Sequence, residues 1–263
     1  MTPGSFQQVV IVAEHEFRKY LRGRRLLGMV ILLALIVGLI LGLPPALGVP
    51  YATTPNAFAA TFANFTGVLV LLCGVLFAAD ALVSEHEKRT GYFLFPNPVR
   101  REAIVAGKLV ASLAATALVL FLFYGAIAIA ALAVTGAASW EIALSYGYAL
   151  AYGTCVVGVA FFLSAVMRTT ISATLLTFFL FFLIFTIVSG VLGATDIDPW
   201  FLPTSASGII GNVLGPPTTA PGPGGGFFAY VPDVTTSLIV FGAYFLIGAL
   251  AAVLIYARRE LVS

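Results

Sequence analysis

Apolar residues fill six long stretches of this chain, and short polar stretches separate them. Each stretch is about 18 residues or longer, enough for a helix rising 1.5 Å per residue to cross the hydrocarbon core of a membrane. The pattern therefore predicts an all-α polytopic membrane protein with six transmembrane helices. We expect the spans at residues 26–43, 65–82, 104–134, 142–166, 171–193 and 236–256.

Residues 1–25 show a different pattern ahead of the first span. Apolar side chains recur there at helical spacing, at Phe6, Val10, Phe17, Tyr20 and Leu21. Polar side chains fall mostly on the other side, at Gln8, His15, Arg18 and Arg22. This spacing predicts an amphipathic helix lying in the inner membrane interface. A cleaved signal peptide is the alternative, but its charged region should be short and free of acids such as Glu14 and Glu16.

Composition and charge agree with a membrane protein. Hydrophobic residues make up 60% of the chain and charged residues 9%, whereas a soluble domain carries roughly 25% charged residues. Basic residues favour the cytoplasmic side of a membrane. We therefore expect both termini in the cytoplasm and a multi-pass protein of the cell membrane. The net charge of +2 follows this topology and indicates no nucleic-acid partner. All 13 Lys and Arg lie in residues 1–25, 81–108, 167–170 or the C-terminal stretch.

The polar stretch 194–235 has no Lys or Arg and is predicted to be an extracytoplasmic loop. It holds seven of the 14 prolines of the chain. Its Pro-Gly-Pro-Gly-Gly-Gly run, at 221–226, requires irregular backbone. We expect two short helices on the outer membrane surface, near residues 200–202 and 209–214.

Ionisable residues avoid the middle of the predicted spans. Asp80 lies near the inner end of the second span, where an acid is by default a functional hypothesis. Because it can reach the interface or pair with a nearby Lys or Arg, a structural role is favoured. Proton-coupled transporters need an ionisable relay at membrane depth, and channels show polar or charged pore rings. The spans offer only Ser, Thr and Tyr, which indicates neither class.

The sequence shows no motif for catalysis. It contains no GxSxG elbow, no His/Glu metal cluster and no GxxxxGK[ST] loop. The pair Gly107-Lys108 lacks the earlier glycine of that loop. His15 and His86 are far apart and are expected to be solvated or interfacial. No catalytic residue, metal site or cofactor is therefore assigned to this chain, and active transport would draw its energy from a cytoplasmic partner.

Polar and aromatic side chains are scattered within the spans. We expect them to pack between helices, and a lipid-like or amphipathic cargo is the alternative that the same composition suits. Cys73 and Cys155 lie in separate apolar stretches and are expected to be buried free thiols. The scattered residues include Thr116, Tyr124, Tyr152, Thr177, Phe178 and Phe182.

The longest charged stretch between spans, residues 81–103, is predicted to be a cytoplasmic loop. From Asp80 to Lys108 it resembles the first cytoplasmic loop of ABC-2-type transporter permeases. That family shows an acid ending span two, a Ser-x-Glu, a Gly-Thr pair, a Pro-Val-x-Arg turn and a Gly-Lys pair opening span three. Thr90-Gly91 reverses the commoner order of one pair. The matching residues are Asp80, Ser84, Glu85, Gly91, Pro98, Val99, Arg101, Gly107 and Lys108.

The resemblance extends over essentially the whole chain, because the six spans, the basic N-terminal helix and the large outer loop also fit. It implies a permease subunit of an ATP-driven transporter, usually an exporter, coupled to a separate ATPase subunit that binds ATP and Mg²⁺. The loop would be a coupling loop, and the N-terminal helix an elbow that also touches the ATPase. The coupling residues would be Ser84, Glu85, Glu87, Arg89, Gly91, Pro98, Arg101 and Arg168.

The resemblance also implies a second permease, either another copy or a related chain. Spans one and five often form that contact in the family. Small residues four apart permit close helix packing. The packing residues would be Gly38, Gly42, Ser189 and Gly193. A non-transporting membrane scaffold or sensor subunit remains the alternative function, since it explains the lack of charges within the spans equally well.

Overall fold

The computed structural model describes residues 5–84, 101–195, 197–215 and 230–258. Every regular element within these ranges is a helix, which confirms the predicted all-α class. The longer helices are α1 (Ser5–Arg22), α2 (Arg25–Ala46), α7 (Arg101–Thr135), α8 (Trp140–Val166) and α13 (Val234–Arg258). A further long helical stretch consists of α9 (Thr170–Phe179), the π-helical turn η2 (Leu180–Ile184) and α10 (Phe185–Ala194).

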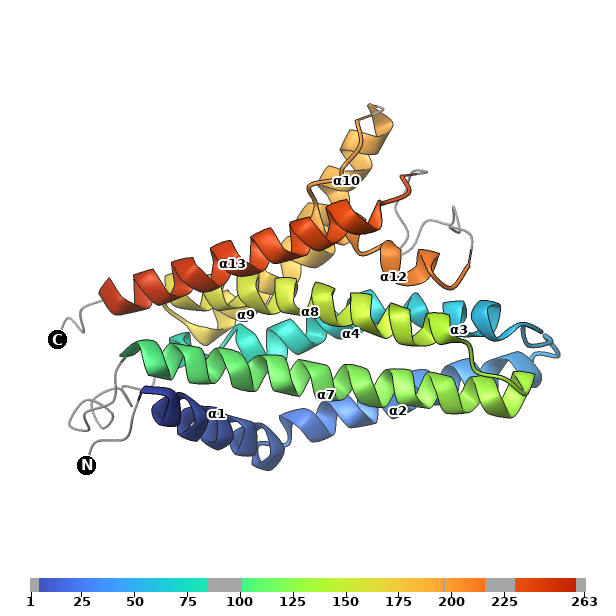
Figure 1. The fold of residues 1–263 in the computed structure, drawn as a ribbon, viewed down its shortest axis with the longest axis horizontal. Coiled ribbons are helices and arrows are strands. Elements are labelled where there is room, and N and C mark those ends of the chain that lie inside the picture. Colours follow the sequence, from blue (N-terminus) through green and yellow to red (C-terminus); the bar gives the residue numbers. More distant parts are fainter. Residues whose placement is uncertain (1–4, 85–100, 196, 216–229, 259–263) are drawn as a thin grey trace.

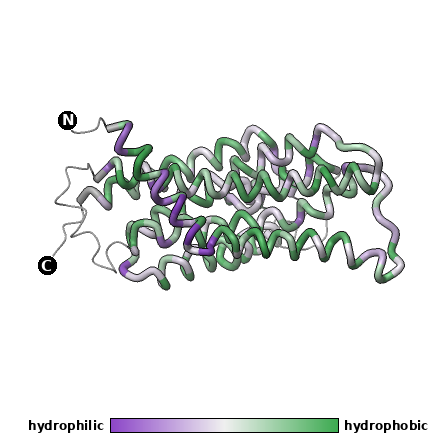
Figure 2. The backbone as a smooth tube through the Cα atoms, turned by 90° about the horizontal axis from the view of Figure 1, so that it is seen from below, coloured by the Kyte–Doolittle hydropathy of each residue, from purple (hydrophilic) through white to green (hydrophobic). Residues whose placement is uncertain are grey.

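The long helices run roughly lengthwise, and α10 diverges from them (Figure 1). The described residues hold five helices that are long and apolar enough to cross a membrane, and a bent pair of helices gives a sixth candidate. Hydrophilic positions concentrate along α1, while the remaining helices are largely apolar (Figure 2). The chain is therefore a multi-pass membrane protein in which α1 differs in character from the other long helices.

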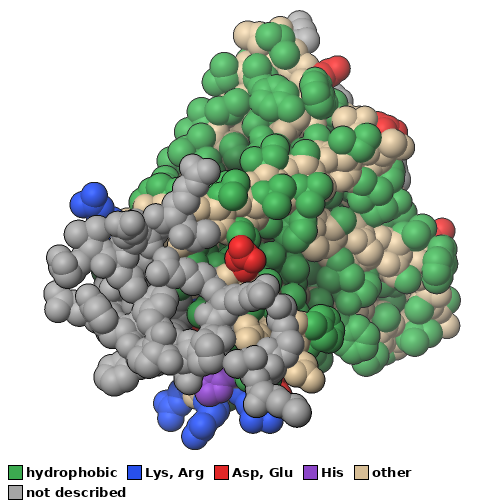
Figure 3. All heavy atoms as spheres, turned by 60° about the vertical axis from the view of Figure 1, so that its left-hand side comes forward, with side chains coloured by type: hydrophobic (Ala, Val, Ile, Leu, Met, Phe, Trp, Pro, Cys, Tyr) green, Lys and Arg blue, Asp and Glu red, His purple; other side chains and the backbone are tan. Residues whose placement is uncertain are grey.

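One end of the bundle carries most of the visible basic side chains. The start of α1, the start of α7 and the end of α13 all lie at this end (Figure 1). Figure 3, in which this end comes forward, shows a group of Lys and Arg side chains at the lower edge and a separate one at the left edge, while hydrophobic side chains cover much of the remaining surface. This separation of charge is the one expected when a single end of the bundle faces the cytoplasm.

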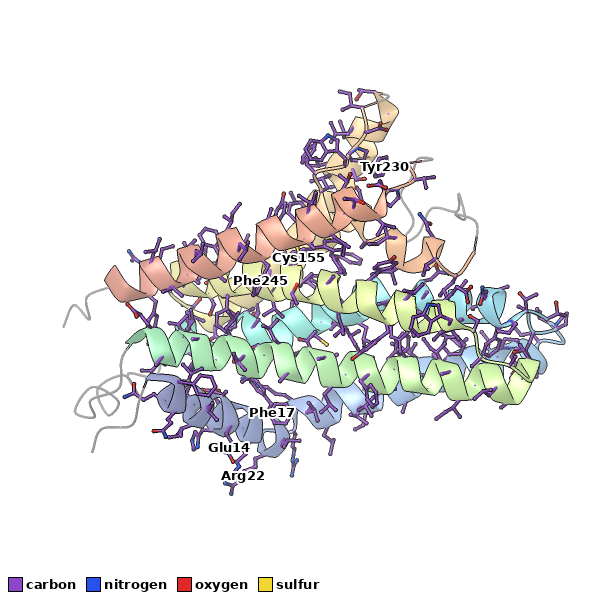
Figure 4. The ribbon with its side chains drawn as sticks, in the orientation of Figure 1. Glu14, Phe17, Arg22, Cys155, Tyr230 and Phe245 are labelled. Atoms are coloured by element: carbon purple, nitrogen blue, oxygen red, sulfur yellow. The ribbon has the colours of Figure 1, made fainter. Side chains whose placement is uncertain are left out.

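Helix α8 is the centre of the bundle, because 67% of the residues in its most apolar stretch are buried. It packs closely on α13 where two glycines face each other. A Cβ on Gly158 would lie 2.8 Å from Phe245 Cα, and a Cβ on Gly248 would lie 2.5 Å from Gly158 O. Figure 4 shows Cys155 and Phe245 in this region, on α8 and α13. Cys155 and Cys73 are buried free thiols, as predicted.

The region of the predicted second span, called span two below, is a bent pair of helices. It consists of α3 (Pro55–Ala63), α4 (Thr66–Cys73) and the π-helical turn η1 (Gly74–Ala78). The axis bends by 41° between α3 and α4. Thr54 begins α3, because its hydroxyl accepts a hydrogen bond from the Ala57 N–H at 3.4 Å. The helical backbone thus starts ten residues before the predicted start of this span at residue 65.

Buried hydroxyl groups hold the bend of span two against α7, α8 and the outer loop. Tyr124 Oη lies 3.3 Å from Thr66 Oγ1 and 2.9 Å from Ser145 Oγ. Ser145 Oγ in turn donates to Ile210 O at 2.8 Å. Tyr124 therefore packs within the core, as do Thr116, Tyr152 and Thr177, in agreement with the prediction of helix packing for these residues. Phe182, by contrast, is exposed.

Of the two short helices expected in residues 194–235, the second is present as α12 (Ile209–Asn212), whereas residues 200–202 are not helical and a short helix, α11 (Pro203–Ala206), follows them. Apolar side chains of this stretch are buried in the core of the bundle. Burial of these side chains removes apolar area from solvent and fixes the loop on the helix ends. The buried residues are Leu202, Ala206, Ile209, Ile210 and Leu214.

Candidate functional site

Span two ends in a segment of irregular helix, residues 74–84, that we call the root segment because it leads into residues 85–100. In η1 the Ala79 N–H donates to Gly74 O at 2.9 Å, a π-type bond that spans five residues. Gly74 allows α8 to lie close, since a Cβ there would approach Val156 Cγ1 to 2.6 Å. Turns replace regular helix at residues 79–82. Such π-helical turns are rare and concentrate at functional sites.

Side chains from α1 and α7 donate hydrogen bonds to backbone carbonyls of the root segment. Tyr20 Oη donates to Phe77 O at 2.8 Å, and Ser112 Oγ donates to the same oxygen at 2.7 Å. Lys108 Nζ donates to Ala81 O at 2.7 Å. These bonds satisfy carbonyls that an irregular helix leaves without regular partners, and they attach the root segment to two other helices.

The root segment is also held from α2 and α8. Arg25 Nη1 donates to Leu76 O at 3.1 Å. The backbone N–H groups of Leu82 and Val83 donate to Ser164 Oγ at 3.0 and 3.1 Å. Donors and acceptors of the root segment are thus bonded to four different helices, although its own helical bonding is irregular.

Three ion pairs support these bonds. Lys108 Nζ lies 3.0 Å from Glu16 Oε1, and both side chains are largely buried. Lys19 Nζ lies 3.0 Å from Glu16 Oε2. Burial alone would raise the pKa of Glu16, but Lys108 and Lys19 together hold it below its ordinary value. Glu16 is therefore ionised at neutral pH and fixes the ammonium group that bonds Ala81 O.

Asp80 forms the third ion pair, with 2.5 Å between Asp80 Oδ2 and Arg25 Nη2. The Asp80 side chain is 9% exposed and that of Arg25 is 36% exposed. The structural role predicted for Asp80, pairing with a basic residue at the end of the span, is thus the arrangement that the structure shows.

Burial also raises the pKa of Tyr20 well above its ordinary value. The phenol therefore stays protonated and remains a donor. We refer to Glu16, Tyr20, Lys108 and Ser112 together as the root cluster.

Gly107 lets α1 approach α7 closely enough to build the root cluster. A Cβ at this position would lie 2.7 Å from Val12 Cβ and 2.9 Å from Val9 O. Ordinary van der Waals contact begins at 3.4 Å. The Gly107-Lys108 pair thus has a structural role: Gly107 leaves room for α1 to pack on α7, and Lys108 pairs with Glu16 of α1.

Helix α1 presents three faces rather than the predicted two. One face meets the bundle and carries Gln8, Glu16 and Tyr20, all buried, although Gln8 was expected on the solvated side. Apolar side chains such as Phe6 lie exposed on a second face. Glu14 and Arg22, on the third face, point away from the bundle (Figure 4). Glu16 was missed as a site residue, and its spacing of four from Tyr20 was the available signal.

The predicted coupling residues fall into two groups. Ser84 is half-buried at the end of the root segment, Arg101 is the first residue of α7, and Arg168 is exposed between α8 and α9. Glu85, Glu87, Arg89, Gly91 and Pro98 lie outside the described residues.

The predicted permease-packing residues also differ among themselves. Gly38 and Gly42 are exposed on α2, and a Cβ at either would meet no atom within 4 Å. Ser189 Oγ instead lies 2.9 Å from Ser205 Oγ, so it bonds the outer loop of the same chain. Gly193 is half-buried near the end of α10.

The site is a set of buried ion pairs and hydrogen bonds that attach residues 74–84 to four helices of an apolar bundle. This arrangement defines a multi-pass membrane protein in which one irregular helical segment is firmly held at its end. The comparison with protein families gives the identity of that class. The model of the ABC-2 family transporter proteins matches residues 10–199, most of the chain. The chain belongs to this family. A comparison with curated proteins found no match.

Proposed function

We propose that the chain is the permease subunit of an ATP-driven exporter and works with a separate ATPase subunit. Family membership supports the permease role. The sequence lacks a GxxxxGK[ST] loop for binding ATP phosphates, so a partner would bind ATP and Mg²⁺. Residues 81–103 would be the coupling loop, and the cytoplasmic membrane would be the location.

The observation that carries this proposal is the bond between Lys108 Nζ and Ala81 O at 2.7 Å. Ala81 is the first residue of the predicted coupling loop, and Lys108 follows the loop by five residues. The bond therefore ties the two ends of the loop to each other, and Glu16 ties both to α1. A loop with fixed ends transmits a push to the helices that hold it, whereas a loop with loose ends absorbs the push.

The proposed mechanism uses this attachment. When two ATPase subunits close on ATP, they would press on the coupling loop of each permease. The root segment would move with α1 and α7, and the displacement would reach the 41° bend of span two. Arg168, exposed in the turn between α8 and α9, would be a second and smaller contact with the ATPase.

A second permease would complete the transport path. Few residues are buried in the most apolar parts of two stretches: 11% in α9–α10 and 17% in α2. Both stretches leave wide apolar surfaces for lipid or for another permease. Gly38 and Gly42 on α2 have the open space that a close helix contact requires.

Co-expression of the chain with its neighbouring genes, followed by a pull-down in mild detergent, tests the proposal. We expect a P-loop subunit at about one copy per permease and ATP hydrolysis by the purified complex. If the chain purifies alone and the preparation hydrolyses no ATP, the permease proposal fails. The alternative of a scaffold or sensor subunit would then take its place.

A further inference from the structure

The root segment combines two properties that oppose each other. Its backbone is irregular, with a π-helical turn followed by non-helical turns, and such backbone deforms easily. It nevertheless lies between the coupling loop and the bend of span two, where force would have to pass. A deformable segment in that position would absorb the movement of the coupling loop before it reached the bend, unless other helices made the segment rigid.

The root cluster provides this stiffening from outside the span. Tyr20 and Ser112 meet at one oxygen, Phe77 O, and their hydroxyl oxygens lie 3.1 Å apart. Four residues further on, Lys108 bonds Ala81 O while Glu16 holds its ammonium group. The two bonded carbonyls lie on either side of residues 78–80, where the π-helical turn passes into the non-helical turns.

The buried charge at Lys108 is not explained by stability alone. A buried ion pair adds little net stability over apolar residues of the same size, because both charges lose their hydration. The pair with Glu16 instead holds the Lys108 ammonium group in a fixed orientation, in which it donates a strong hydrogen bond to Ala81 O. The buried hydroxyl of Tyr20 is likewise held in one orientation, in which it donates to Phe77 O.

We propose that Glu16, Tyr20 and Lys108 are positioning residues that make the root segment rigid, so that movement of the coupling loop reaches the 41° bend of span two. The N-terminal helix is then part of the transmission path and not only an elbow in the membrane interface. This inference rests on the proposed function, because it needs an ATPase that moves the loop.

The test uses the complex of permease and ATPase with a single reporter cysteine. Cys73 and Cys155 are replaced by alanine, and Asn64, exposed at the bend, is replaced by cysteine. The measured quantity is the ratio of maleimide labelling rates with and without ATP and orthovanadate. The unsubstituted cluster is expected to give a ratio that differs from one.

Two cluster variants leave no charge buried without its partner. Glu16→Gln with Lys108→Met neutralises both members of the pair, and Tyr20→Phe leaves Phe77 O bonded to Ser112. We expect both variants to bind the ATPase at the original stoichiometry, to retain ATP hydrolysis and to lose the nucleotide-dependent ratio. Lys108→Arg, which keeps a charged donor, should retain it.

Matched controls separate positioning from general damage. Glu14→Gln with Arg18→Met removes an exposed ion pair from the same helix, and Tyr244→Phe removes a hydroxyl from α13; both should keep the ratio. If the cluster variants keep the ratio, or if both lose the ATPase while the controls keep it, the inference is overturned. If no ATPase binds even the unsubstituted permease, the proposed function fails first and the inference fails with it.

Discussion

The close contact at Gly107 gives a prediction whose size follows from the structure. Replacing Gly107 by alanine places a Cβ 2.7 Å from Val12 Cβ and 2.9 Å from a backbone oxygen of α1. Neither atom is the free end of a flexible side chain. Relief to the ordinary contact of 3.4 Å therefore requires α1 to move away from α7 by about 0.7 Å, and overpacking of this kind costs about 1–3 kcal/mol.

The matched control is Gly125→Ala on the same helix, where an added Cβ meets no atom within 4 Å. Both substitutions gain the same helix propensity, about 1 kcal/mol. The difference between the variants thus isolates the contact with α1. At roughly 2–4 °C per kcal/mol for a chain of this size, Gly107→Ala should unfold about 2–12 °C below Gly125→Ala.

Thermal unfolding of the purified permease in one detergent, followed by circular dichroism, measures this difference. The same shift of α1 would lengthen the 2.8 Å bond from Tyr20 to Phe77 O, so Gly107→Ala should also reduce the labelling ratio at position 64. Equal unfolding midpoints for the two alanine variants would refute the reasoning, because α1 would then not be packed on α7 at the distance described.

Three further predictions concern charge. Arg25→Leu should destabilise the fold more than Asp80→Asn, by up to about 3 kcal/mol in unfolding free energy, because it leaves the more buried member of the pair unpaired; equal losses in chemical unfolding would contradict this. The lowered pKa of Glu16 means that its ionised form stabilises the fold near neutral pH and that this contribution is lost as pH falls through the folded value. The difference in unfolding midpoint between the unsubstituted chain and Glu16→Gln should accordingly close in acid, and a difference independent of pH would count against the ion pair. Joint replacement of Glu85 and Arg89 by alanine should weaken ATPase co-purification and leave membrane insertion intact, whereas unchanged co-purification would remove these residues from the coupling surface.

Much of the fold could be predicted because a membrane-spanning helix is recognisable from one continuous apolar stretch of sequence. Long apolar stretches had to be helices, since backbone polar groups find no water in hydrocarbon. Helix α3 was not predicted, because the second span was expected to begin at residue 65, where the break between α3 and α4 lies. The hydroxyl of Tyr124 on α7, which bonds Thr66 at this break, lies far away in the sequence.

The site was predictable only in part for a similar reason. The charges of the 81–103 stretch and the Gly107-Lys108 pair drew attention to the region that the root segment borders. The role of Glu16 depends on which face of α1 meets α7, and the predicted amphipathic helix in the membrane interface left that contact open. The face that meets the bundle is mixed: Val12 packs on Gly107, while Glu16 and Tyr20 bond Lys108 and a carbonyl of the root segment.

The most direct test of the account is a cross-link between the coupling loop and the ATPase in intact cells. A photo-reactive amino acid replaces Arg89 in one variant and Ile197, exposed in the outer loop, in a control. The account predicts an adduct at position 89 with the combined mass of permease and ATPase, containing a peptide with the P-loop sequence, and no such adduct at position 197. Absence of the adduct at position 89 with the ATPase co-expressed, or equal adducts at both positions, would contradict the claim that this chain is the permease of an ATP-driven transporter.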